Sequence, residues 1–562
     1  MRIVKNPLGI LILFGFLMTS EHFVSAQNPA PEPTPEALST ESTGVVSLPD
    51  EPAVTPMPEP TFVPVPAPKP AAPPPSIWKG IPPAFVFSRP GEFLVPPTDC
   101  GYYSLIDAIQ GNCLEKPPAM PYGRISLKPY PFYDVDFSYL DNPKNQQCDW
   151  SDCLKRRELG CNWLFTTGAE VRNRYMAETN SRLTGNQNTY EQLRTMTYGS
   201  LWYQDVFGVF AQGIDAHSFG QELAPLGIDV NRTDLVDLFV DLKVFEIDDA
   251  PVYVRGGRQE LNLGSQRLVS DLEWANTLRT FQGVRMFRKT EKLDVNLFWM
   301  QPIVIDPSNF DSPNEDQNFT GIWTTFRPEK GHFIDAYALN LDRATPLVVG
   351  NGGVPGPSNI TTIGARYAGD HNNWLWDFEQ MLQFGAYSNQ NLFAGASSNG
   401  VGYHFADRSW KPQLWFTYDY ASGDGNPGAG NSFNTFNQLF PFGHYYMGYL
   451  DLVGRQNIHD FHTQFAMYPT NWITFLTQFH HFRLDSPTSP LFNAGGVPIR
   501  VDATGASGVD VGNEIDFLAN FHIGTHQDVL VGYSKLFAGN FLKNTGNGSS
   551  PELFYLQHQF RF

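Results

Sequence analysis

The strongest constraint on the fold is an alternation of apolar and polar residues that recurs from residue 163 to the C-terminus. In "DLVDLFVDLKVF" the apolar residues share one face of an extended chain: Val236, Leu238, Val240, Leu242 and Val244. In "KLDVNLFWM" the same holds for Leu293, Val295, Leu297 and Trp299. A period of two residues is the pattern of a β-strand, because successive side chains of a strand point to opposite faces.

The connections between these segments are of two kinds that alternate along the chain. Short polar turns such as "EIDDA" and "YPTN" alternate with long loops rich in Gly, Asn, Ser and Pro, which leaves eighteen candidate strands. The pattern predicts an all-β fold, a transmembrane antiparallel β-barrel of about eighteen strands over 163–562. Closure of a barrel pairs the backbone N–H and C=O groups that hydrocarbon cannot hydrogen-bond. A soluble β-sandwich or propeller is the alternative.

The N-terminus carries the features of an export signal, which we assign to residues 1–26. Arg2 and Lys5 form a short positive region, an apolar run of eleven residues follows, and Val24-Ser25-Ala26 offers a small-residue cleavage site. The run is too short for a membrane-spanning helix, which needs about 20 residues. With the barrel pattern, the signal predicts localisation in the cell outer membrane.

Two segments separate the signal from the barrel. Residues 27–77 form a Pro-rich linker that cannot bury a core, since sixteen of the 45 prolines fall in 29–75. Residues 78–162 form a periplasmic subdomain or an N-terminal plug. This segment holds all the cysteines: Cys100, Cys113, Cys148, Cys153 and Cys161. Outside the cytoplasm they suggest up to two disulfides with one thiol left over.

The last strand ends the chain on an aromatic residue. In "PELFYLQHQFRF" one face carries Phe554, Leu556, Phe560 and Phe562. The pattern resembles the C-terminal signature by which outer-membrane barrels are recognised for assembly. It predicts the barrel-assembly machinery as a partner through Phe562, and outer-membrane lipid around the barrel.

A cluster of basic residues stands out in a chain whose net charge is −19. Between Arg255 and Lys289 lie seven basic residues (six Arg and one Lys) and three acids. The strand count places 251–262 and 280–290 in neighbouring strands. In the second strand, Val284 and Met286 share a face that suits lipid. Its other face, toward the lumen, carries Arg279, Phe281, Gly283 and Arg285.

The first of these strands does not alternate cleanly. A β-bulge at Gly256-Gly257 would reset the register, so that Arg258 and Glu260 face the lumen beside Arg255. Without the bulge, Arg258 would face lipid at a cost of ~2–4 kcal/mol near the midplane. The bulge is therefore the favoured interpretation.

The loop between these strands, 263–279, contains "SDLE" at 270–273, which fits the Ser-x-x-Glu capping box. The motif predicts a short helix over 271–278. A loop stiffened in this way can fold into the lumen and narrow it, whereas a loop that only covers the barrel mouth is the alternative. We predict a pore constriction formed by these substrate-binding residues: Arg255, Arg258, Glu260, Arg267, Arg279 and Arg285.

Arginine suits a passage for carboxylated sugars. Its planar guanidinium meets a carboxylate with two parallel hydrogen bonds and stays charged at any working pH. The neighbouring acids, Glu260, Asp271 and Glu273, would hold the arginines in place and keep binding reversible. The alternative role of such Arg–acid ladders is rigidity of the barrel wall.

Three stretches resemble the alginate-export family of outer-membrane porins. They are "GRQELNLGSQRLVSDLEWANTLRTFQGVRM", "ARYAGDHNNWLWDFEQMLQFGAY" and "YDYASGDGNPGAGNSFNTFNQLFPFGHYYMGYLDLVGRQN", within a resemblance that covers about 163–562. It implies an eighteen-stranded barrel that conducts an anionic polysaccharide through an arginine-rich constriction. The pore-facing positions it implies are Arg258, Arg267, Arg279 and Arg285. Residues 27–162 lie outside the family's barrel, and the loop here mixes acids with its arginines.

Other groupings carry less weight. Asp419, Asp424 and Asn426 lie in a Gly-rich loop, a conceivable calcium site for which a solvated turn is favoured. Among His459, His462, His480 and His481, the adjacent pair must point to opposite faces, so we assign no metal ligand. Nothing marks a nucleophile, and we expect no enzymatic activity, catalytic residue or cofactor.

The expected partner is an anionic poly- or oligosaccharide, with periplasmic export or cell-wall components as further partners and no nucleic acid. The alternatives to such a channel are an uptake or general porin and a barrel that anchors the outer membrane to the cell wall. A barrel enzyme, such as a phospholipase or polysaccharide lyase, is a third class.

Overall fold

The computed structural model describes residues 80–81, 98–118, 122, 131–145, 149–353, 355–428 and 430–562. The signal peptide predicted for 1–26 and the linker predicted for 27–77 lie outside these residues. The chain divides into two compact units, 1–73 and 74–562, and the description that follows concerns the second. No helix among the described residues is long and apolar enough to cross a membrane.

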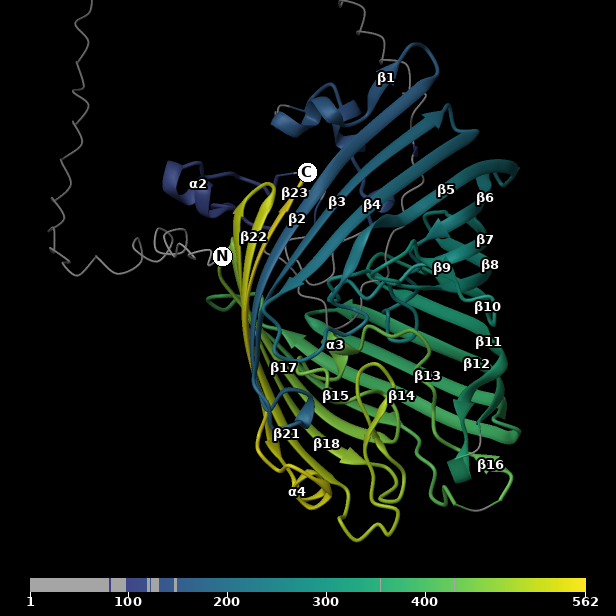
Figure 1. The fold of residues 1–562 in the computed structure, drawn as a ribbon. Coiled ribbons are helices and arrows are strands. Elements are labelled where there is room, and N and C mark those ends of the chain that lie inside the picture. Colours follow the sequence, from purple (N-terminus) through teal and green to yellow (C-terminus); the bar gives the residue numbers. More distant parts are fainter. Residues whose placement is uncertain are drawn as a thin grey trace, which may run out of the picture. The chain divides into compact units, whose positions relative to one another are not determined.

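Eighteen long strands in the described part of the chain form one closed antiparallel β-barrel (Figure 1). Each pairs with the next along the chain, and the last pairs with the first, which confirms the predicted fold class and strand number. The strands are β2 (Trp163–Thr179), β3 (Asn188–Tyr203), β4 (Phe207–Phe219), β5 (Asn231–Ile247), β6 (Ala250–Gln259), β7 (Phe281–Arg288), β8 (Leu293–Val304), β10 (Gln317–Phe326), β11 (Phe333–Val349), β12 (Pro355–His371), β13 (Trp374–Tyr387), β14 (Gln390–His404), β15 (Gln413–Ala421), β17 (Ile458–Thr470), β18 (Ile473–Leu484), β21 (Asp510–Gly524), β22 (Gln527–Ala538) and β23 (Glu552–Arg561).

Short elements decorate the barrel. The short strands are β1 (Arg157–Leu159), β9 (Ser312–Pro313), β16 (Ser432–Phe433), β19 (Leu491–Phe492) and β20 (Pro498–Arg500). The α-helices are α2 (Leu105–Gln110), α3 (Gly443–Tyr446) and α4 (Asn540–Thr545). The 3₁₀ helices are η1 (Phe132–Asp134), η2 (Ser138–Asp141), η3 (Trp150–Leu154), η4 (Ser181–Leu183) and η5 (Asn351–Gly353).

The two ends of the barrel differ in their connections. Asp248-Asp249 and Asn372-Asn373 form two-residue turns with positive φ at both residues, a conformation that short Asp and Asn side chains tolerate. We call this the short-turn end. The opposite, long-loop end carries residues 220–230, 305–316, 422–457 and 485–509.

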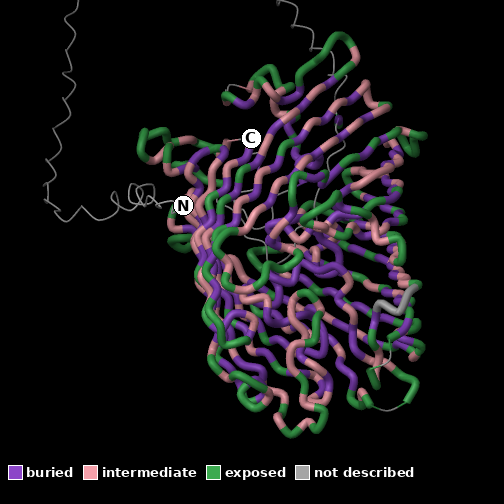
Figure 2. The backbone as a smooth tube through the Cα atoms, viewed as in Figure 1, coloured by how far each residue is buried: buried purple, intermediate pink, exposed green. Residues whose placement is uncertain are grey.

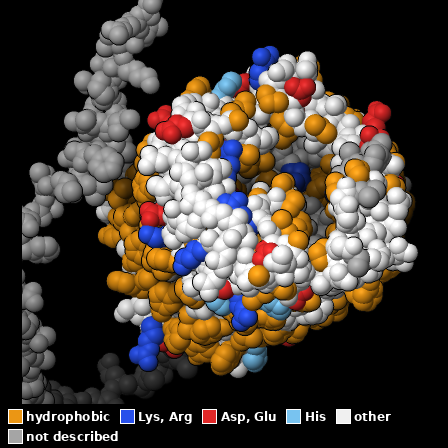
Figure 3. All heavy atoms as spheres, turned by 60° about the horizontal axis from the view of Figure 1, so that its bottom comes forward, with side chains coloured by type: hydrophobic (Ala, Val, Ile, Leu, Met, Phe, Trp, Pro, Cys, Tyr) orange, Lys and Arg blue, Asp and Glu red, His pale blue; other side chains and the backbone are white. Residues whose placement is uncertain are grey.

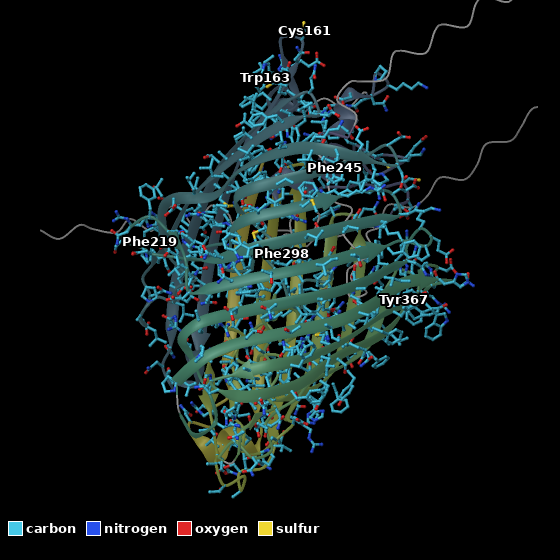
Figure 4. All side chains as sticks on the ribbon, turned by 90° about the vertical axis from the view of Figure 1, so that its right-hand side faces the viewer. Cys161, Trp163, Phe219, Phe245, Phe298 and Tyr367 are labelled. Atoms are coloured by element: carbon cyan, nitrogen blue, oxygen red, sulfur yellow. The ribbon has the colours of Figure 1, made fainter. Side chains whose placement is uncertain are left out.

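Buried residues alternate with more exposed ones along the strands, and the exposed positions carry apolar side chains on the outer face (Figure 2 shows the burial). On β8, Phe298 is buried inside, whereas Leu297 and Trp299 are exposed outside. Figure 4 labels Phe298 together with Tyr367, which lies on the outer face of β12. Hydrophobic side chains cover much of the outer wall seen in Figure 3. The period-two pattern is therefore the division between lipid and lumen.

One residue of β5 departs from the predicted face. Val236 is buried, while Leu235 takes the outer position and Leu238, Val240 and Leu242 follow it as predicted. The cause is a bulge, because Gln212 of β4 pairs with Asp237 and the next residue pairs with Leu235, which leaves Val236 unpaired.

The four cysteines within the described residues are exposed and form no disulfide bond, so the disulfides expected among them are wrong; Cys148 lies outside these residues. Cys161 lies at the tip of the β1–β2 hairpin (Figure 4), and Cys153 lies in η3, where its thiol donates to the Trp150 carbonyl. A disulfide needs Cα atoms about 4.4–6.8 Å apart with matched Cβ directions.

The C-terminal strand has the predicted face. Phe554 is exposed and Leu556, Phe560 and Phe562 are half-buried, whereas Tyr555, Gln557, Gln559 and Arg561 on the other face are buried. Recognition of Phe562 by the assembly machinery stays a prediction.

An arginine on the outer face should destabilise the barrel according to its depth. Leu297→Arg, in the middle part of β8, should lower the free energy of unfolding in lipid vesicles by ~2–4 kcal/mol, because a charge at the bilayer midplane is poorly solvated. Val304→Arg at the end of the same strand is the matched control, with an expected cost of ~0–1 kcal/mol. Equal costs at both positions would contradict the assignment of this face to lipid.

Candidate pore constriction

Residues 260–280, between β6 and β7, turn into the barrel, and we call them the inward loop. Arg267, in its first half, bonds to Asp377 of β13. Its second half is held by arginines of β2 and β3. Because β13 is the eleventh of the eighteen long strands counted from β2, these contacts reach opposite walls. The inward loop therefore crosses the lumen and does not merely cover the mouth.

Three wall arginines hold the second half of the inward loop. Their guanidinium groups donate hydrogen bonds to three successive backbone carbonyls, at 2.8, 2.8 and 3.3 Å. The pairs are Arg172 with Glu273, Arg174 with Trp274, and Arg194 with Ala275. Arg174 also lies 3.7 Å above the Trp274 ring, and Arg194 forms ion pairs with Glu170 and Glu273.

The helix predicted for 271–278 does not form. Leu272 has a φ of 56°, and the Ser270 hydroxyl accepts from the Leu272 amide at 2.8 Å, so the capping box is not completed. In an α-helix each carbonyl accepts from the N–H four residues later. Here the arginines of β2 and β3 take the carbonyls of residues 273–275, and the loop stays irregular.

Arg267 anchors the first half of the loop to β13. Its Nη1 lies 3.2 Å from a carboxylate oxygen of Asp377 and 3.2 Å from one of Glu379. Asp377 also pairs with Arg366 of β12 at 2.8 Å, and the Tyr337 hydroxyl donates to Glu379 at 2.8 Å. Arg267 is thus embedded in a network of wall carboxylates.

A second loop packs on the inward loop. Residues 434–457, which include α3, lie inside the barrel in Figure 1. Backbone hydrogen bonds join Phe440 to Leu268 and Ser270, and Phe442 to Gln266, at 2.9–3.0 Å. The two loops and the inner wall share one buried apolar cluster. Together they narrow the lumen, which is hollowed from the long-loop end with basic side chains around it (Figure 3).

Arg255 and Arg285 lie on the lumen face of β6 and β7, as predicted. Arg255 makes two 2.8 Å hydrogen bonds to the carboxylate of Asp241, and Arg285 donates to the Asn296 side chain at 3.0 and 2.7 Å. Both side chains are nearly fully buried. Glu260 is also buried at the start of the inward loop. Arg255 and Arg285 are each bonded to a polar side chain of a neighbouring strand, so they are wall groups in the described conformation.

The predicted orientation of Arg258 is wrong. The β5–β6 register runs unbroken from Arg255 to Arg258, so Gly256-Gly257 form no bulge; the register shift lies instead between Lys243 and Phe245. Arg258 pairs with Leu238 and shares its outer face. Near the long-loop end of β6, its guanidinium donates to the carbonyls of Leu235 (2.9 Å) and Asp311 (2.7 Å). These bonds remove it from the pore.

Arg279 is the predicted constriction residue within the lumen that remains partly exposed. Its guanidinium donates to the carbonyls of Ser270 and Pro441 at 3.2 and 3.1 Å, and no carboxylate among the described residues forms an ion pair with it. Burial lowers the pKa of Arg279 to about 10, so it stays charged at neutral pH. Burial and the Glu273 carboxylate raise the pKa of the nearby Asp271 to about 6.

Several lumen-facing arginines were missed by the sequence analysis: Arg172, Arg174, Arg194, Arg366, Arg455 and Arg561. In β2 the two-residue alternation already indicated lumen-facing charges, because Glu170, Arg172 and Arg174 alternate with residues of the outer face.

Asp419 and Asp424, considered above as calcium ligands, do not come together in one site. Asp419 pairs with Arg455, and Asp424 accepts hydrogen bonds within its own loop, where it is buried rather than solvated.

Residues 131–137, which we call the lumen segment, precede the barrel strands in the chain and lie inside the barrel. The Phe132 ring stacks on Tyr198 at 4.3 Å, and the Tyr133 hydroxyl donates to the Glu260 carbonyl at 2.9 Å. The Arg255 guanidinium lies 4.5 Å from the Tyr133 ring. The lumen segment shares an apolar cluster with β3, β4 and β5. It therefore fills part of the lumen against the inward loop.

A cavity of about 280 Å³ lies between the inward loop and the long-loop ends of β2, β3 and β23. Its lining combines charged and aromatic side chains, among them Arg174, Arg182, Asp229, Tyr190, Trp274 and Tyr449. This mixture of charge and aromatic surface fits a ligand that has both polar groups and apolar ring faces.

Residues 164–556 match the protein family described as alginate export. The chain belongs to the alginate-export family. No curated protein matches the chain. The match extends from β2 into the first half of β23 and includes the inward loop, and it agrees with the resemblance carried by the three stretches quoted above.

Solved structures similar to this chain include three proteins of Pseudomonas aeruginosa, of which OprD is described as an outer membrane protein. OprD is 11% identical, with 71% of this chain and 93% of that chain covered and a TM-score of 0.46. OccK11 (OpdR) is 11% identical over 71% and 96%, with a TM-score of 0.45. OccK8 (OprE) is 12% identical over 71% and 98%, with a TM-score of 0.46.

For this alginate-export family member, Arg174→Ala should loosen the inward loop. The variant loses a hydrogen bond from a charged donor, ~1.5–3 kcal/mol, which shifts the loop toward detached conformations by about one to two orders of magnitude. Single-channel recordings should show more frequent current fluctuations. Arg182→Ala is the control, because Arg182 donates to the Ala224 carbonyl outside the loop. Equal fluctuation rates in both variants would show that Arg174 does not restrain the loop.

Proposed function

We propose that this alginate-export family member is an outer-membrane channel that passes anionic poly- or oligosaccharides through an arginine-lined constriction. The observation that carries the proposal is the inward loop, which brings Arg267 and Arg279 into the lumen beside the wall arginines. The short-turn end would face the periplasm and the long-loop end the exterior, as in bacterial outer-membrane barrels.

The chemistry of the constriction favours a carboxylated chain. Each guanidinium can meet a carboxylate with two parallel hydrogen bonds. Arg279 has carbonyl partners and partial exposure, so it is the arginine best placed to meet a passing uronate. The 280 Å³ cavity, lined by Arg174 and Trp274, would form a neighbouring subsite on the long-loop side.

The acids around the arginines keep binding reversible. Glu273 pairs with Arg194, and Asp377 and Glu379 pair with Arg267, so a polyanion must compete with resident carboxylates for each guanidinium. This competition lowers the affinity of any one position. A channel requires such sites, because an ion that binds too tightly does not leave.

The lumen segment would limit the flow. Phe132 and Tyr133 occupy space beside Arg255 and Glu260, on the path between the short-turn end and the inward loop. We assign residues 78–162 the role of a plug on the periplasmic side, held by these contacts. Its displacement would be needed for the full width of the channel.

Arg279→Ala should lower the anion selectivity of the channel in planar bilayers and weaken block of the ionic current by polyuronate about tenfold or more, the loss expected for one charge-assisted hydrogen-bond partner. Arg258→Ala is the matched control, because Arg258 lies on the outer face. A general porin would show no polyuronate block in the wild type. Loss of block in Arg258→Ala alone would overturn the assigned constriction.

Removal of residues 27–145 should raise the single-channel conductance, since it removes the lumen segment and leaves the barrel strands intact. Removal of residues 27–77 alone is the control and should leave the conductance as in the full mature chain. If the longer deletion also leaves it unchanged, the lumen segment does not restrict the pore. A barrel that stays closed in both cases would favour the structural anchor.

A further inference from the structure

Two histidines and an aspartate meet on the lumen face where β17 and β18 pair. His462 lies directly opposite His480, and Asp460 precedes His462 by two residues on the same face. Directly opposed residues of an antiparallel pair have Cβ atoms about 4.5–5.5 Å apart. All three side chains are buried, and one donor atom from each lies within 4.8 Å of the others. His481 and His459 point to the outer face and take no part.

The hydrogen bonding of this cluster is incomplete. Nδ1 of His480 lies 2.7 Å from one oxygen of Asp460. His462 is 2% exposed, and neither of its ring nitrogens has a hydrogen-bond partner among the described residues. Its ring only stacks on that of His480, at 4.2 Å. A neutral imidazole has one donor and one acceptor, and leaving them buried and unpaired costs ~1–3 kcal/mol each. A bound ion would satisfy a nitrogen that no protein group satisfies.

The surrounding charges favour a cation. Asp419 lies opposite Asp460 on β15, and Glu514 lies opposite His480 on β21. A carboxylate oxygen of Asp516 lies 3.8 Å from Nε2 of His480. The nearest arginines are already engaged by carboxylates: Arg455 by Asp419, and Arg267 by Asp377 and Glu379. Acidic side chains of β15 and β21 therefore adjoin the cluster.

We propose that Asp460, His462 and His480 form a binding site for a divalent transition-metal ion of the Zn²⁺ class. Two imidazoles and one carboxylate are a ligand set that Zn²⁺ accepts, with a fourth position left for water or Asp516. The ion links β17 to β18 on the lumen side. The proposal does not depend on the transported substrate, because the site is built into the barrel wall.

The test is Zn²⁺ binding by the complete mature protein, folded in detergent, without a histidine tag and stripped of metal by a chelator. Isothermal titration calorimetry should show one equivalent of Zn²⁺ bound to the wild type. His462→Asn should weaken binding by about 100-fold or more, since even outer-sphere changes weaken metal sites about 10- to 100-fold. His481→Asn is the control, because its side chain lies on the outer face and bonds to Asn513. Circular dichroism and heat-dependent gel migration verify the fold of each variant.

A second measurement, made on the wild type alone, tests the proposal if His462→Asn fails to fold. X-ray absorption of the Co²⁺-loaded wild type should report two imidazole nitrogens and carboxylate oxygen around the ion. Three results would overturn the proposal: no Zn²⁺ bound by the folded wild type, equal affinity in His462→Asn and wild type, or a Co²⁺ coordination sphere without imidazole nitrogen.

Discussion

Arginines buried inside this barrel keep their charge, so each must be surrounded by carboxylates or carbonyl oxygens, and this requirement determines how the lumen is filled. At β2 and β3 the wall supplies the guanidinium groups and the inward loop supplies carbonyls and Glu273. At β13 the roles are reversed, because the wall supplies Asp377 and Glu379 and the loop supplies Arg267. The loop is thereby held from both walls, and a regular helix is lost in exchange for carbonyls that the arginines can reach.

The barrel could be predicted because its determinant is local. In "KLDVNLFWM" the alternation is set by the two-residue repeat of an extended chain, and Leu297 and Trp299 lie outside as expected. The face of Arg258 could not be predicted in the same way. It depends on where the extra residue of a neighbouring strand is accommodated, and that site is between Lys243 and Phe245 rather than at Gly256-Gly257. Bulge positions follow from pairing between strands, which one strand's pattern does not contain.

The inward loop was predictable in composition but only partly in geometry. The inward path of the loop and the lumen position of Arg267, Arg279 and Arg285 agree with the prediction. The prediction of a helix over 271–278 was wrong because distant groups take its carbonyls. Arginines about 100 positions earlier in the chain donate to the carbonyls of Glu273 and Trp274, which in a helix would accept from N–H groups four residues later. From the sequence, residues 78–162 could form either a plug or a separate subdomain. The contacts of the lumen segment with Tyr198 and Glu260 join residues far apart in the chain, and no pattern in its own sequence predicts them.

The internal ion pairs also bear on which solute the proposed channel favours. A resident carboxylate such as Glu273 or Asp377 can leave a guanidinium only if another acceptor takes its place, because an unpaired buried charge is costly. A uronate carboxylate makes that exchange nearly neutral, with the same two parallel hydrogen bonds. A neutral sugar offers hydroxyl groups, which restore the hydrogen bonds but not the charge. Selectivity would then arise from the cost of opening each ion pair, and the dense pairing that narrows the lumen would be the same feature that admits a polyanion.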